Sequence, residues 1–141
     1  MKRRIVLVLC ALSFCVVAAN GADKKKAEAI SAYCHVCEAA SRISLELVGM
    51  LAKYPYESPM VKYAAKIADV NTSVFENATV PAGAESVHEH FGKAVAAFEK
   101  AVKLHHQAEY KASKEAARKC TTEFVRAVAE VKKLRKEGVI P

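Results

Sequence analysis

The longest segment without a helix breaker limits the fold of this chain most, because neither proline nor glycine occurs between residues 93 and 137. Proline and glycine disfavour helix interiors most strongly, so their absence lets a helix continue. Upstream, Ser86 and Glu89 have the Ser-x-x-Glu spacing of a capping box, and Gly138 suits a helix C-terminus. The sequence predicts a third helical stretch of up to about 50 residues here, roughly 75 Å long at 1.5 Å per residue.

Two further helical stretches precede it. The first is predicted over residues 23–54 and ends where Pro55 and Pro59 forbid continuation. The second is predicted over residues 59–76, with Ser58 as its N-cap. Its apolar side chains on one side are Met60, Tyr63, Ile67, Val70 and Val74. Alanine is frequent and strand-type runs are missing, so the predicted class is all-α, a bundle of three to four long antiparallel helices.

The apolar faces of these stretches differ in breadth. On an ideal helical wheel the first stretch is apolar over more than half of its circumference, so it needs neighbours on two or more sides. Its narrow polar strip consists of His35, Glu38, Arg42, Glu46 and Lys53. The third stretch has a narrower apolar stripe, which His105 and Glu109 interrupt. We therefore expect any bend or reversal of the third stretch near residues 105–107.

The N-terminus has the pattern of a secretory signal peptide. Three basic residues at positions 2–4 precede an apolar run over residues 5–19, and small residues follow near Gly21. The run is short for a membrane span, which takes about 20 apolar residues. We predict a signal peptide over residues 1–21, one helical domain over residues 22–141, and a secreted or cell-surface location.

Three cysteines follow the predicted signal peptide, and an oxidising compartment favours at least one disulfide among them. Cys37 lies inside the apolar arc of the first stretch and Cys120 lies on the stripe of the third, so we predict a Cys37–Cys120 bridge, with Cys34 free or as the alternative partner. Such a bridge excludes three unbroken helices running up, down and up. A four-helix bundle that turns back near His105 and an elongated hairpin both stay compatible with it, and we favour the compact bundle.

The charge balance argues against nucleic acid as a partner. The full sequence carries a net charge of +7, of which residues 2–4 contribute three, leaving +4 after the predicted cleavage. Lysine and arginine alternate with glutamate along every stretch instead of gathering on one face, as they do in nucleic-acid-binding proteins.

Two acceptor motifs for N-linked glycosylation lie close together. They are Asn71-Thr72-Ser73 and Asn77-Ala78-Thr79, and neither has proline in its middle position. Asn77 lies where the second helix meets a turn-rich segment, so we expect it to carry a glycan. Asn71 borders the apolar stripe of the second helix, where a sugar would compete with packing, so we expect lower occupancy there.

The sequence carries no recognisable catalytic or cofactor motif. Cys34 and Cys37 form a C-x-x-C pair inside a predicted helix, whereas redox enzymes place this pair at a helix N-terminus after a strand. The histidines are spaced so that no two share a helix face, so we predict no metal site and no cofactor. His105 and Glu109 form a polar gap in an apolar stripe, which makes them the candidate ligand-binding residues, although local accommodation is the favoured interpretation.

The combined layout resembles the helical-bundle surface glycoproteins of trypanosomes. The features that carry this resemblance are the signal peptide, the segment Lys-Ala-Glu-Ala-Ile-Ser-Ala-Tyr-Cys-His that ends at His35, the late Ala-Ala-Arg-Lys-Cys that ends at Cys120, and the acceptor asparagines. The group includes alanine-rich coat proteins, variant coat proteins and host-ligand receptors. It usually carries a lipid-anchor signal, which is not visible in this chain.

The resemblance implies a non-enzymatic coat or host-interaction glycoprotein, whose partner is a host or cell-surface protein. Association with a membrane would require a lipid anchor, and a homo-oligomer is compatible with this interpretation. The alternatives are a receptor module that binds a small molecule or a host protein, and a secreted helical enzyme inhibitor.

Overall fold

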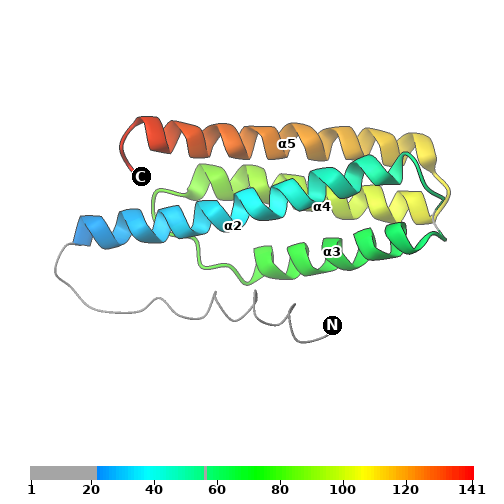
Figure 1. The fold of residues 1–141 in the computed structure, drawn as a ribbon, viewed down its shortest axis with the longest axis horizontal. Coiled ribbons are helices and arrows are strands. Elements are labelled where there is room, and N and C mark those ends of the chain that lie inside the picture. The colour runs from blue at the N-terminus through cyan, green and yellow to red at the C-terminus, as the bar shows by residue number, and fades with distance from the viewer. Residues whose placement is uncertain (1–21, 56) are drawn as a thin grey trace.

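The computed structural model describes residues 22–55 and 57–141, so the predicted signal peptide lies outside the described residues. These residues form four helices, α2 (Ala22–Leu51), α3 (Pro59–Glu76), α4 (Glu85–His106) and α5 (Tyr110–Lys136), and contain no strand. The helices run alternately in opposite directions and pack side by side (Figure 1). All pairs of helices pack together except α3 and α5, which are diagonal to each other. The predicted all-α bundle is confirmed.

The predicted reversal near His105 is also confirmed. α4 ends at His106, and α5 begins four residues later at Tyr110. The Glu109 backbone N–H donates to the Leu104 carbonyl (2.9 Å), and Ala108 has a φ of +60°, in the left-handed region. The chain therefore turns back within three residues and without glycine, which is why neither glycine nor proline marks this point in the sequence.

Two helix ends form as their residues predict. The Ser58 hydroxyl accepts a hydrogen bond from the Val61 N–H (3.3 Å) at the start of α3. At the end of α5, Gly138 has a φ of +72° and the Val139 N–H donates to the Leu134 carbonyl (3.0 Å). This bond pattern is a Schellman motif, in which glycine supplies the left-handed residue that closes the helix.

The predicted capping box at Ser86 is wrong. α4 begins at Glu85, and its N-cap, Ala84, has no side chain that could cap the helix. The Glu85 carboxylate accepts the Gly83 N–H instead (2.8 Å), and Glu89 pairs with Lys93 one turn further on. Ala84 is buried, so packing of the loop fixes where the helix starts.

The core lies between the four helices and is centred on aromatic rings of α4 and α5. Phe91 and Phe124 are fully buried, with ring centroids 6.0 Å apart, and Phe98 of α4 is also fully buried. Small residues line the α4–α5 contact, among them Ala94, Ala97, Ala101 and Ala116. Because these side chains are short, the two helix backbones can approach closely.

The core-facing side of α3 differs from the apolar side predicted from the sequence. The buried residues are Val61, Ala64, Ala68 and Asn71, whereas Tyr63 is 49% exposed and Val70 is 38% exposed. Each buried residue directly follows a residue of the predicted stripe, so the buried face is rotated by about 100° from it. We call Met60, Tyr63, Ile67, Val70 and Val74 the α3 stripe. Small side chains and the contact of Phe75 with Gly92 position α3, rather than maximal burial of apolar surface.

We predict opposite effects for two glycine-to-alanine substitutions within helices. A Cβ atom at Gly92 would collide with the Phe75 ring, which is already stacked on His88, so Gly92→Ala should destabilise the protein by about 1–3 kcal/mol through overpacking. Gly49→Ala is the matched control, since no atom lies within 4 Å of the new methyl group. It should stabilise α2 by about 1 kcal/mol. Urea unfolding followed by circular dichroism measures both changes, and a stabilised Gly92→Ala variant would contradict the packing described here.

Candidate functional site

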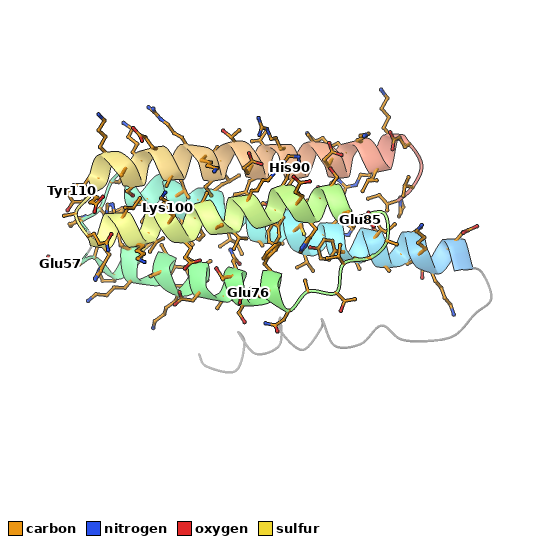
Figure 2. All side chains as sticks on the ribbon, turned by 180° about the vertical axis from the view of Figure 1, so that it is seen from behind. Glu57, Glu76, Glu85, His90, Lys100 and Tyr110 are labelled. Carbon is orange, nitrogen blue, oxygen red and sulfur yellow. The ribbon has the colours of Figure 1, made fainter. Side chains whose placement is uncertain are left out.

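The structure does not bring the two candidate ligand-binding residues into one site. His105 is 4% exposed, its Nε2 bonds the Tyr54 carbonyl oxygen (2.9 Å), and its ring meets Tyr110 edge-on at 5.1 Å. Glu109 is exposed and lines a shallow open depression formed by residues 108–112 and Glu115. His105 therefore ties the end of α4 to the end of the α2–α3 connection. The two connections lie at the same end of the bundle, where Figure 2 labels Glu57 and Tyr110.

The predicted Cys37–Cys120 bridge is not formed, and Cys34, Cys37 and Cys120 are all free, buried thiols. Cys37 lies on the side of α2 that carries Tyr33, which contacts α4. The side of α2 that faces α5 carries Glu38, whose carboxylate pairs with Arg135 (2.9 and 3.0 Å). A helical wheel shows that Cys37 and Cys120 are both directed into the core, but it does not show that they point at each other.

Burial makes the thiols poor nucleophiles. It raises the pKa of Cys37 to about 12 and that of Cys120 to about 12, and it is also the main reason why the pKa of Cys34 is raised. Because the thiolate is the reactive form of cysteine, such thiols are nearly inert at neutral pH. The C-x-x-C pair therefore has the properties of core side chains.

The two acceptor asparagines have contrasting environments. Asn71 is buried, and its Nδ2, the atom to which a glycan would be attached, donates to the Ser44 hydroxyl of α2 (2.7 Å). Asn77 is exposed just beyond the end of α3, where its Nδ2 donates to the Ser73 carbonyl (2.7 Å). An amide nitrogen has two hydrogens, so Asn77 can keep this bond after one is replaced by a sugar. Only Asn77 offers an accessible attachment point in the folded bundle.

Sequence reasoning missed a cluster at the junction of three helices. The Tyr33 hydroxyl of α2 lies 2.6 Å from His88 Nδ1 of α4, and the His88 ring stacks on Phe75 of α3 with centroids 4.4 Å apart. Burial, followed by the neighbouring Cys37, raises the pKa of Tyr33 well above its ordinary value, so the phenol keeps its proton. His88 has no distinctive sequence context, so only the packing of α3 onto α4 could have revealed the cluster.

A second missed group links α4 to α5. Glu123 is 5% exposed, and its two carboxylate oxygens bond His90 Nδ1 and Arg126 Nη1, both at 2.8 Å. The hydrogen bond from His90 is the main reason why the pKa of Glu123 lies below its ordinary value, and the Arg126 charge adds to this effect. In Figure 2, His90 lies at the boundary between the two helices. The group acts as a polar cross-link between the two helices.

An open groove of about 440 Å³ also follows the outer side of the α4–α5 contact. Its floor consists of short or apolar side chains, Ala96, Ala97, Leu104, Ala112 and Ala116, and its rim carries Lys93, Lys100, Glu115 and Lys119.

The described residues place limits on other kinds of site. Every buried side-chain nitrogen or oxygen among them has a hydrogen-bond partner. Residues 22–55 and 57–141 contain no group of three or more histidine, cysteine or acidic side chains that could hold a metal ion. No helix in the same residues is both long and apolar enough to cross a membrane. The polar side chains of the interior are therefore bonded within the protein.

Comparison of the chain with protein-family models, curated proteins and solved structures finds no match.

We predict that the three thiols react only when the bundle opens. In the native protein at neutral pH, Cys34, Cys37 and Cys120 should react with a disulfide reagent such as Ellman's reagent at least about a hundredfold more slowly than in strong denaturant, where all three should be titrated. Two thiols that stay unreactive in denaturant until a reductant is added would show that a disulfide is present.

The contribution of Glu123 to stability should depend on pH. A carboxyl group whose folded pKa is lowered stabilises the fold above its unfolded pKa of about 4.5, and this contribution is lost as the pH falls through the lower folded value. Glu123→Gln should therefore unfold more readily than the wild type at neutral pH, and the difference should shrink under acid. Urea unfolding at several pH values measures it, with the exposed Glu115→Gln as control. A difference that grows towards low pH would contradict the assignment.

Proposed function

We propose that this protein is a non-enzymatic secreted or cell-surface glycoprotein, whose helical bundle serves as a surface-coat or host-interaction protein. The observation that carries the proposal is the position of Asn77. This asparagine is exposed directly after α3, which ends partway along the bundle, so it lies on the flank of the bundle and away from the end with the two connections that contain Glu57 and residues 107–109 (Figures 1 and 2). A glycan there would cover part of this flank and leave the end with the two connections free.

The arrangement of the interior supports the non-enzymatic part of the proposal. Several buried and half-buried polar groups bind a group on another helix, as in the pairs Asn71–Ser44, His90–Glu123 and Tyr33–His88. A catalytic group has to reach a substrate, whereas these groups are occupied by each other. Their chemistry is that of a scaffold, and the outer surface is left to carry the function.

The resemblance to helical-bundle surface glycoproteins of trypanosomes adds a specific form to the proposal. It implies a role in shielding a cell surface or in contacting a host protein, with the signal peptide directing the chain into the secretory pathway. The buried Asn71 fits the expectation of low occupancy at this acceptor, because a sugar on its Nδ2 would separate α3 from α2.

We predict one N-linked glycan, on Asn77. Secretion of the full chain from a eukaryotic cell should give a protein whose mass falls by one glycan after treatment with peptide N-glycosidase F. Asn77→Gln and Thr79→Ala should both abolish this shift. Thr79→Ala is the sharper test, since it removes the acceptor motif and keeps the Asn77 hydrogen bond to Ser73.

The matched control for the first acceptor motif is Ser73→Ala, which leaves the Asn71–Ser44 bond in place and should not change the glycan mass. Antibody labelling of unpermeabilised source cells, together with assay of the medium, tests the location. A chain that stays in the cytosol without a glycan would overturn the proposed function.

A further inference from the structure

The α3 stripe has the spacing of an interhelical seam although it lies at the outer edge of the bundle, where Tyr63 and Val70 are exposed and Ile67 is half-buried against the core. Its residues Met60, Tyr63, Ile67, Val70 and Val74 alternate in steps of three and four, which is the heptad pattern of helices that pack along each other. The stripe is also nearly symmetric about Ile67. In an antiparallel pair centred there, Met60 lies level with Val74 of the other helix, and Tyr63 lies within one residue, about 1.5 Å, of the level of Val70.

α2 extends this apolar surface. Val36, Ile43 and Met50 repeat every seven residues, and Ile43 is 46% exposed. The adjacent Ser44 bonds Asn71 of α3, whereas Glu38, on the other side of α2, pairs with α5. The helical period therefore places Val36, Ile43 and Met50 on the side of α2 that borders α3. Ile43 is exposed there, whereas Val36 and Met50 are half-buried and Met50 packs against the core. We call these three residues together with the α3 stripe the α2/α3 face.

The charges of α3 suit a second copy of the same helix. The helix contains four charged residues, Lys62 and Lys66 in its first half and Asp69 and Glu76 in its second half. All four are exposed, and none of their side chains forms a hydrogen bond or ion pair with another described residue. In an antiparallel pair centred on Ile67, Lys66 of each copy lies within one residue, about 1.5 Å, of the level of Asp69 of the other. A parallel pair would instead bring like charges together.

We propose that the α2/α3 face binds a second copy of this chain, forming a two-fold symmetric dimer in which the two α3 helices pack antiparallel about Ile67. A two-fold axis requires a surface that is complementary to itself, and both the apolar spacing and the charge order of α3 meet this requirement. The proposal goes beyond the glycoprotein function and does not depend on it.

The positions of the acceptor asparagines agree with this surface. Asn71, in the middle of α3, is directed into the core, so a sugar would not cover the stripe there. Asn77 follows the last turn of α3, so its glycan would border the face at its end. A seam along an 18-residue helix is only about 27 Å long, which is short for a stable interface of about 800 Å² per partner. We therefore expect a weak, reversible dimer.

Sedimentation equilibrium of the secreted chain over about a hundredfold range of concentration tests the proposal. The wild type should shift from monomer to dimer. Val70→Glu should weaken the dimer by at least about tenfold, whereas Val125→Glu, on α5 and 58% exposed, should have no effect. Both sites are exposed, so circular dichroism should show the same folded helical content.

A charge swap tests the antiparallel register. Lys66→Glu should weaken the dimer because it places two acids level with each other, and adding Asp69→Lys should restore it, since the pair is then exchanged between the copies. A wild-type protein that stays monomeric overturns the proposal. The proposal is overturned equally if that monomer binds lipid vesicles or a host protein through the same face. A dimer that resists Val70→Glu, or that Asp69→Lys fails to restore, overturns it as well. The glycan on Asn77 is measured in a separate experiment. The proposed function can therefore be tested whether or not the protein forms a dimer.

Discussion

The close packing of α4 against α5 is the interaction on which the rest of the bundle depends. The two helices approach along short side chains, and the Ser113 hydroxyl donates to the Ala101 carbonyl across the contact (2.8 Å). The tight reversal at Ala108 turns one long helical segment into this pair. α3 packs on α4 and does not touch α5, and α2 packs on both members of the pair. The alanine-rich α4–α5 hairpin is therefore the platform on which the other two helices are placed.

Much of this fold could be predicted from the sequence where a local rule decides the outcome. Ser58, Pro59 and Gly138 fix helix ends through hydrogen bonds to their own neighbours, so their roles could be read directly. The reversal after His105 was predicted from a polar gap, and the bridge used to support it is not formed. The prediction succeeded because both polar residues suit a helix end, whatever the cysteines do: His105 bonds the carbonyl of Tyr54 in the neighbouring connection, and Glu109 is exposed.

The failures concern relations between helices. The direction in which Cys37 points, the start of α4 and the buried face of α3 all depend on which neighbour a helix side meets. The same holds for the candidate site, because His105 lies against a carbonyl 51 residues away and the Tyr33–His88 contact spans 55 residues. A single sequence shows which chemical groups such residues carry, but it does not show which residues of other helices they contact.

The rotation of α3 has an energetic consequence. Complete burial of an exposed large apolar side chain gains about 1.5–3 kcal/mol, so each half-exposed residue leaves roughly 1 kcal/mol unrealised in the isolated bundle. Ile43, Tyr63 and Val70 are in this state, and a two-fold partner doubles their contribution. The resulting gain of about 6 kcal/mol is comparable with the cost of associating two molecules, about 4–15 kcal/mol. Pairing through this face is therefore weak in dilute solution and is favoured where copies are crowded, as they would be in a surface coat.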